Sequence, residues 1–197
     1  MTTTKSKKTT TKKLSSTPIP ELSANPFAFE VLELVSKQRT IAKKVEVLKK
    51  YKHDSLVSIF VWNYDTALSS ALPPGDVPYA GTGEQTSYSG TLGDKISDAV
   101  SKMEEIGTKS LGSQDQGRTT IRREYRIFYN FIRGGNDSLS SLKRESMFIN
   151  LLQGLHPLEA EILILCKDKK LDTKYKIDKK HIAQAYPEIT WRDGFTL

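Results

Sequence analysis

The sequence predicts an all-α protein: a small helical bundle with a disordered basic N-terminal tail and a long irregular middle segment. Three observations support this fold class. Apolar residues recur at helical spacing in both halves of the chain, between residues that favour helix starts and ends. The first 13 residues contain five lysines and no acidic residue. Residues 73–117 are rich in Gly, Ser and Thr and lack the apolar pattern of a core element.

The predicted tail spans residues 1–24. It alternates Thr, Ser and Lys and then gives Pro18-Ile19-Pro20. Because it can bury too little apolar surface to offset the entropy of ordering, we expect it to be disordered. Removing its five lysines from the 30 basic residues leaves 25 against 23 acidic ones, so the net charge of +7 belongs mainly to the tail. These lysines are Lys5, Lys7, Lys8, Lys12 and Lys13.

A first helical unit is predicted for residues 25–72. Asn25-Pro26 favours a helix start, with Asn as the N-cap and Pro in the first turn. Thr40 can cap a second helix, and a third, more apolar segment follows His53. A strand is the alternative for residues 57–61, but the flanking helical patterns favour a helix. The apolar positions are Phe27, Val31, Leu34, Val35, Ile41, Val45, Leu48, Leu56, Ile59, Phe60 and Trp62.

Residues 73–117 are predicted to be a flexible linker or an insertion. Pro73-Pro74-Gly75 stops regular structure at their start, and one weak amphipathic piece lies at residues 96–106. A stretch of this length without a core pattern is also typical of a partner-binding segment.

A second helical unit is predicted for residues 118–197. Its first helix, residues 120–133, carries an apolar stripe and ends at Gly134-Gly135. Asn136 or Asp137 can cap the next helix, and His156-Pro157 starts another. A short helix follows, and Trp191 is expected to pack the C-terminal segment onto the bundle. Each unit alone is small and marginal, so we expect the two to share one core. The apolar stripe of the helix predicted for residues 120–133 consists of Ile121, Tyr125, Phe128 and Ile132.

Two groups of residues are candidates for nucleic-acid binding. The tail lysines can neutralise phosphates, although a solubilising, weakly used terminus explains them slightly better. In the predicted helix, a second stripe lies about 100 degrees from the apolar one. Arginine forks match phosphates and a tyrosine among them can stack on a base, whereas the alternative is a solvated helix face. This stripe consists of Arg122, Arg126, Tyr129 and Arg133.

No enzyme chemistry is predicted. His53, His156 and His181 lie far apart in the sequence and show no metal-ligand spacing. Cys166 ends an apolar helix, as expected of a buried small hydrophobe rather than a nucleophile. Gly134-Gly135 lacks the sequence context of a phosphate-binding loop. We therefore expect no catalytic residue, no metal and no cofactor, and no apolar run approaches the roughly 18 residues of a membrane span.

Several stretches together resemble a family of uncharacterised proteins from T4-like tailed phages, including marine cyanophages. The tail and residues 81–117 look like additions to the pattern of that family. The resemblance implies a virus that replicates in a bacterium, and it implies no activity and no catalytic residues. The stretches are Phe29-Glu30-Val31-Leu32-Glu33, Lys49-Lys50-Tyr51, Leu72-Pro73-Pro74-Gly75, Leu155-His156-Pro157-Leu158-Glu159-Ala160-Glu161, Lys167-Asp168-Lys169-Lys170-Leu171 and Ala185-Tyr186-Pro187.

Two functions remain open. The first is a non-enzymatic phage accessory protein that binds DNA or RNA in DNA metabolism or transcription. The alternative is a protein-interaction or virion-assembly factor whose partner is a phage or host protein. Both place the protein in the cytoplasm of an infected bacterial host, or in the virion, without a membrane.

Overall fold

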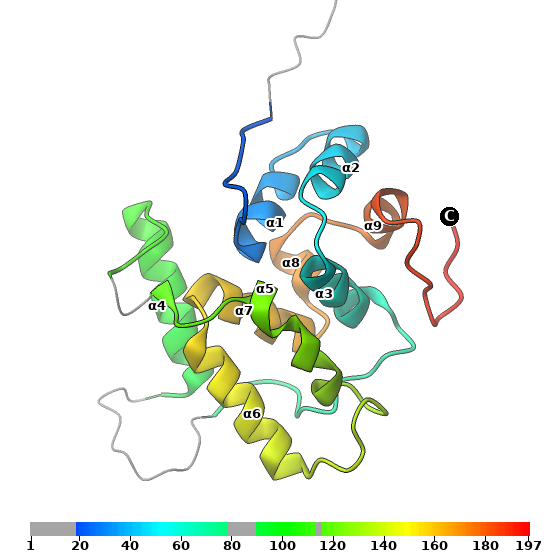
Figure 1. The fold of residues 1–197 in the computed structure, drawn as a ribbon. Helices are drawn as coiled ribbons and strands as arrows, with labels where there is room; N and C mark the ends of the chain where they lie inside the picture. The colour runs from blue at the N-terminus through cyan, green and yellow to red at the C-terminus, as the bar shows by residue number, and fades with distance from the viewer. Residues whose placement is uncertain (1–18, 79–89, 113–115) are drawn as a thin grey trace, which may run out of the picture.

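The computed structural model describes residues 19–78, 90–112 and 116–197, and these residues form a helical bundle (Figure 1). No strand forms within these ranges; a single antiparallel bridge joins Ser70 and Ile132. The predicted all-α class is thus confirmed. The elements are α1 (Ala28–Ser36), α2 (Ile41–Lys50), α3 (Asp54–Tyr64), α4 (Leu92–Ile106), α5 (Ile121–Glu124), the 3-10 helix η2 (Tyr125–Phe131), α6 (Ser141–Gly154), α7 (Pro157–Lys167), α8 (Leu171–Lys174) and α9 (Lys179–Ala185).

The helix starts in the N-terminal part agree with the sequence at two of three places. The Thr40 hydroxyl accepts a hydrogen bond from Lys43 N and caps α2, and His53 Nδ1 accepts one from Ser55 N at the start of α3. Residues 57–61 lie inside α3, so the helical prediction is confirmed there. Asn25 is not an N-cap, because α1 begins at Ala28, after Phe27.

Helix α7 lies at the centre of the core, and α1, α3, α4 and α6 all pack on it (Figure 1). An aromatic cluster joins the two halves of the chain: the Trp62 ring of α3 lies 5.5 Å from Phe128 and 6.0 Å from Phe131, between centroids. Buried residues from α1 to Trp191 belong to one hydrophobic cluster. Cys166 on α7 is fully buried in it, as predicted.

Helix α4 forms within the stretch predicted as a flexible linker or insertion. Its apolar face is buried, and it packs on α7 at one side of the molecule (Figure 1). Thr91 caps its start, since the hydroxyl accepts from Asp94 N and the Asp94 carboxylate accepts from Thr91 N. Gly107 ends it with a φ of +72°, a conformation that favours glycine. The buried face consists of Leu92, Ile96, Val100 and Met103.

The helix predicted for residues 120–133 is mostly not α-helical. Only α5 is, and η2 continues it as a 3-10 helix. The reason lies in Tyr125, Phe128 and Phe131, which recur every three residues and turn toward the core, a spacing that matches three residues per turn. Ile132 then takes an extended conformation, so the predicted stripe is interrupted before its last member.

Two other predicted boundaries differ from the structure. Ser140, rather than Asn136 or Asp137, caps α6 by accepting from Lys143 N. Residues 19–24, predicted as part of the disordered tail, lie against α2, where Leu22 N donates to the Tyr51 hydroxyl at 2.8 Å. The apolar side chain of Leu22 is partly buried there, which the lysine-rich composition of the tail concealed.

The C-terminal segment packs on the bundle as predicted. Trp191 is buried, and Lys179 Nζ lies 4.4 Å from the centre of its ring and 4.7 Å from that of Phe195. The Asp193 carboxylate pairs with Lys179 and accepts from Thr66 N. In the parts of the chain that the structure describes, no helix has the length and apolar character needed to cross a bilayer.

Candidate nucleic-acid interface

The predicted binding residues fall into two sets. The five tail lysines, Lys5, Lys7, Lys8, Lys12 and Lys13, lie outside the described residues. Arg122, Arg126, Tyr129 and Arg133 all lie on or next to the α5–η2 element. Arg126, Tyr129 and Arg133 are exposed and Arg122 is half-buried, so the stripe is open to solvent for most of its length.

The 3-10 geometry changes which of these residues share a face. Residues three apart are aligned in such a helix, which places Arg126 and Tyr129 together, with Arg123 leading into them from α5. Tyr129 leaves 53% of its surface exposed. Arg133 lies beyond η2, where its Nε donates to the Ser70 carbonyl at 3.2 Å.

Arg126 is supported by an aromatic side chain. Its guanidinium lies 5.9 Å from the centre of the Tyr125 ring, and Nε donates to the Tyr125 hydroxyl at 3.4 Å. The hydrogen bond to this hydroxyl is the main cause of a raised pKa of Arg126. His53 contacts the same ring edge-on, at 5.8 Å between centroids. The pKa of His53 is lowered, first by burial and then by the nearby positive charge of Arg122.

Arg122 lies in a cavity of about 330 Å³ together with Glu159. The Glu159 carboxylate is fully buried and accepts two backbone hydrogen bonds, from Ala28 N at 3.1 Å and from Ile121 N at 2.9 Å. Burial raises the pKa of Glu159, while these two bonds and the charge of Arg122 act in the opposite direction. Glu159 thus joins the first residues of α1 and α5 to α7.

A larger cavity of about 480 Å³ adjoins this one and was not predicted from the sequence. The two share Phe27, Thr120 and Arg123 among their lining residues. We call the larger one the Phe27 cavity, defined by Phe27, Phe29, Glu30, Lys109, Arg118, Thr119, Thr120, Arg123 and His156.

The turn before α5 holds Arg118 at the wall of the Phe27 cavity. Arg118 N and Thr119 N both donate to the Gly154 carbonyl, at 2.7 and 3.0 Å. Gly117 makes this approach possible, because a Cβ there would lie 2.5 Å from His156 N, and its φ is +78°. Arg118 was missed because it precedes the helix predicted for residues 120–133; the signal available was its place at the head of an arginine-rich run.

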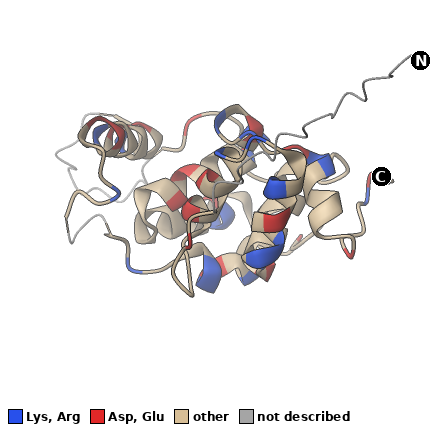
Figure 2. Ribbon diagram, turned by 90° about the horizontal axis from the view of Figure 1, so that it is seen from above, with Lys and Arg blue, Asp and Glu red and all other residues tan. Residues whose placement is uncertain are grey.

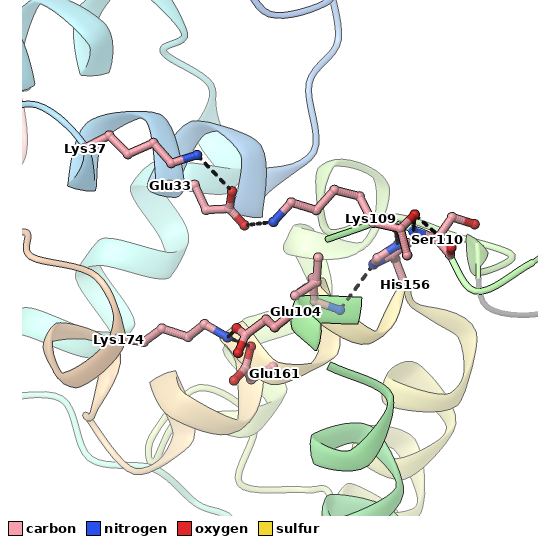
Figure 3. Close-up of polar contacts among 10 residues, drawn as sticks. Glu33, Lys37, Glu104, Lys109, Ser110, His156, Glu161 and Lys174 are labelled. Atoms are coloured by element: carbon pink, nitrogen blue, oxygen red, sulfur yellow. Dashed lines mark hydrogen bonds and ion pairs between the residues drawn. The ribbon is translucent and has the colours of Figure 1, made fainter. Parts of the chain in front are cut away.

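Lys109 and His156, which line this cavity, lie beside a group of lysine–glutamate ion pairs (Figure 3). Lys109 reaches Glu33 on α1, and its carbonyl oxygen lies 2.7 Å from His156 Nε2. His156 Nδ1 accepts from Leu158 N at the start of α7, so both ring nitrogens have partners. Lys174 bridges Glu104 of α4 and Glu161 of α7. These contacts fix the loop after α4 against α1 and α7.

Lysines, and not arginines, make the internal ion pairs. Basic and acidic residues are interspersed over the helices, so charge alone does not mark out one surface (Figure 2). Ion pairing does distinguish the two kinds of basic residue. No arginine of the described ranges pairs with a carboxylate. Within the described ranges, no side-chain hydrogen bond is formed by Arg118, Arg122 or Arg123 either. The paired lysines are Lys37, Lys50, Lys52, Lys109, Lys167, Lys174 and Lys179.

Lys167 and Cys166 have structural roles. The buried Lys167 Nζ donates to the carbonyls of Pro73 and Gly75 and pairs with Asp168, which fixes the proline-rich loop. Burial raises the pKa of the Cys166 thiol, as expected for an inert cysteine. Within the described residues, no group of three His, Cys, Asp or Glu side chains could hold a metal ion.

Comparison with known proteins places the chain in a family. The model of a family of unknown function, DUF6433, matches residues 31–92 and 108–173. The unmatched residues between these segments are those of α4 after Leu92, together with Gly107. All the arginines from Arg118 to Arg133 lie in the matched part, whereas the basic tail does not. No curated protein and no solved structure matches the chain. The chain belongs to the family DUF6433.

Proposed function

We propose that this member of DUF6433 is a non-enzymatic accessory protein that binds DNA or RNA. The binding surface is the α5–η2 element and the turn before it, which we call the arginine face. One observation carries the proposal: the arginine face holds five of the eight arginines of the chain, and none of them pairs with a carboxylate of the described residues. The face consists of Arg118, Arg122, Arg123, Arg126, Tyr129 and Arg133.

The charges of the arginine face favour a partner outside the protein. Like charges on neighbouring turns repel one another, and no ion pair within the described residues offsets that cost; Glu159 attracts Arg122 and Asp54 attracts Arg126 only through space. Arginine presents a planar fork that fits phosphate oxygens in a bidentate manner, and it sheds its hydration more easily than lysine does. An external polyanion with regularly spaced phosphates would satisfy several of the five at once. The exposed ring of Tyr129 adds a surface on which a base can stack.

The tail strengthens this function without supplying specificity. Its five lysines can contact phosphates and increase the rate of capture. With the resemblance to proteins of T4-like tailed phages, the proposal becomes a phage accessory factor in DNA metabolism or transcription. It would act in the cytoplasm of the infected host, with packaging in the virion as the other location.

The test is a salt series with labelled single-stranded and double-stranded DNA and RNA. The proteins are the full chain, a variant lacking residues 1–24, Arg122→Ala/Arg126→Ala, and Arg39→Ala as a matched exposed arginine outside the face. Each lost phosphate contact lowers the slope of log K against log salt by about one. We expect the deletion and the double variant to lower it and Arg39→Ala to leave it unchanged.

Two results would contradict the proposal: no binding of any nucleic acid at low salt, or binding that the double variant does not weaken. In the second case the tail alone would bind, and the folded part would have another role. Circular dichroism of each variant establishes that it is folded.

A second candidate, a protein-interaction or virion-assembly factor, is favoured by one specific feature. The proline-rich loop borders an apolar cavity of about 260 Å³ lined by Leu72, Val77, Phe148 and Ile149. Lys167 holds this loop in place, so the cavity is preformed. Capture of a phage or host protein that is lost in Val77→Asp and unaffected in Arg122→Ala/Arg126→Ala would support this candidate over nucleic-acid binding.

A further inference from the structure

We infer that the Phe27 cavity binds a nucleoside phosphate, with the base on the Phe27 ring and the phosphate between Arg118 and Arg123. The inference rests on the proposed nucleic-acid binding and adds a defined site to it. The same chemistry can come from the end of a nucleic-acid strand or from a free nucleotide.

The cavity has an aromatic floor. Phe27 and Phe29 stack with ring centroids 5.3 Å apart and an angle of 15° between planes, and His156 stacks on Phe29 at 5.0 Å. The Phe27 and His156 rings also lie 5.7 Å apart between centroids, so the three rings form one cluster. Phe29 and His156 are buried in it, whereas Phe27 is only partly buried. A half-buried ring at the edge of a cavity offers a flat apolar surface, which suits the face of a base.

The charges around this floor favour an anion. Arg118 and Arg123 are exposed cations without an acidic or hydrogen-bonding side-chain partner in the described parts of the chain. Lys109 is neutralised by Glu33, at 2.5 Å. Glu30 is the acid among the lining residues, and its carboxylate is engaged by Phe27 N at 2.8 Å. The lining therefore has a net positive charge, and two free guanidinium groups carry it.

The size and rigidity of the cavity fit a small ligand. Its volume of about 480 Å³ lies within the range of roughly 300–1,000 Å³ that is usual for such sites. The Gly117–Thr119 turn is tied to the Gly154 carbonyl, and His156 is fixed through both ring nitrogens. Since His156 has no free nitrogen, the site is arranged for binding and not for proton transfer.

The position of Arg123 connects the cavity to the outer surface. Arg123 lines the cavity and precedes Arg126 by three residues on the α5–η2 element. A strand whose terminal nucleotide occupies the cavity can therefore continue over Arg126 and Tyr129. This continuity favours a strand end as the natural source of the nucleoside phosphate.

The first experiment is calorimetric titration of the full chain with deoxyadenosine monophosphate, deoxyadenosine and inorganic phosphate. The variants are Phe27→Leu and Arg118→Ala/Arg123→Ala, with the exposed Arg39→Ala as a control outside the cavity and the arginine face. We expect the monophosphate to bind best and each cavity variant to weaken it about tenfold or more, since each removes one of the two recognition elements. The control should retain binding within a factor of about two to three.

The second experiment separates the two sources. Short single strands with and without a 5′- or 3′-terminal phosphate are compared with the mononucleotide on the same proteins. Tighter binding of a phosphorylated strand, lost in Arg118→Ala/Arg123→Ala, assigns the cavity to strand ends; equal or tighter binding of the mononucleotide assigns it to free nucleotides.

Two results would overturn the inference. One is no binding of the monophosphate or of a terminal phosphate by a protein that still binds internal nucleic acid through Arg122 and Arg126; the proposed function would then stand without the cavity. The other is monophosphate binding that neither cavity variant weakens. Because Arg118 and Arg123 are exposed, their substitution leaves the fold intact even if Phe27→Leu is unstable.

Discussion

Glu159 is a buried carboxylate that performs a structural task far from its own helix. Its two oxygens accept the backbone N–H groups that begin α1 and α5, and the first of these is 131 residues away in the sequence. The first N–H groups of a helix have no partner within the helix, so a buried helix start needs an acceptor from elsewhere. A single side chain supplies that acceptor for two helices.

Replacing Glu159 by Gln should destabilise the protein by about 1–3 kcal/mol, because the amide keeps one acceptor oxygen and leaves one buried N–H unpaired. The lower desolvation cost of a neutral side chain offsets part of this loss. Urea unfolding measures the difference, with the exposed Glu46→Gln as a control that should stay within about 0.5 kcal/mol of the parent. An unchanged unfolding midpoint for Glu159→Gln would show that the two bonds contribute little.

His53 makes the stability of the protein sensitive to acid. Its neutral Nδ1 accepts from Ser55 N, and its pKa lies below the ordinary value of 6.5 in the folded protein. The unfolded chain therefore takes up the proton first, and the stabilisation is complete above about pH 6.5 and is lost as the pH falls through the lowered pKa. His53→Asn keeps a capping acceptor without titrating.

We expect acidification from about pH 7 to pH 5 to reduce the stability of the parent more than that of His53→Asn. Urea titrations at both pH values measure this, and the comparison cancels other groups such as His181, whose pKa is also lowered. Equal losses of stability in the two proteins would exclude His53 as the source of the acid sensitivity.

At the scale of elements, the turn at Gly117 sets the position of the arginine face. Gly117→Ala brings a Cβ to within 2.5 Å of His156 N, whereas Gly134 has nearly the same φ, +77° against +78°, and open space around it. Gly134→Ala should cost about 1–2 kcal/mol from the left-handed backbone alone. Gly117→Ala should cost clearly more. Comparing the thermal unfolding of the two variants isolates the steric part of the loss in stability. Equal effects would mean that the turn can shift away from α7.

The same element shows why local reading of the sequence goes wrong. Tyr125, Phe128 and Phe131 repeat at intervals of three, but Ile121, Tyr125, Phe128 and Ile132 also fit an α-helix, so periodicity alone permitted both. Packing of Phe128 and Phe131 on Trp62 selects the tighter helix. Local caps were predicted with mixed success: Thr40 caps α2 as predicted, because the acceptor and its N–H are neighbours in the sequence, whereas Asn25 and Asn136 or Asp137 do not cap the helices predicted for them.

The candidate site was predictable only in part, for a related reason. The arginine run of residues 118–133 is visible in the sequence, but its spacing left open which of its members are exposed. The Phe27 cavity is not visible in the sequence, because Phe27, Lys109 and His156 come together only through packing of α1 and the loop after α4 against α7. The start of α1 was misplaced at Asn25 for the same reason, since Glu159 supplies its acceptor from the other half of the chain.

At the scale of the whole molecule, the two helical units depend on each other. Trp62 packs on Phe128 and Phe131, and Tyr186 donates its hydroxyl to the Leu48 carbonyl at 2.6 Å. Residues 118–197 alone would expose the surfaces that bind α1 and α3, so we expect this fragment to lack a cooperative thermal transition. In the full chain, tryptophan fluorescence and far-ultraviolet circular dichroism should report one coincident transition. Two separate transitions would contradict a shared core.

The burial of Cys166 means that chemical modification of its thiol can measure how often the protein opens locally. The thiol is inaccessible, and its Sγ lies against the Ile59 carbonyl of α3, so a thiol-reactive dye reaches it only when α7 separates from α3. At saturating reagent the rate of modification equals the rate of that separation, and at low reagent it reports the population of the open form. Since the sequence contains no other cysteine, each modified molecule records a single event, and a second thiol engineered on the surface could be tagged selectively in the native state.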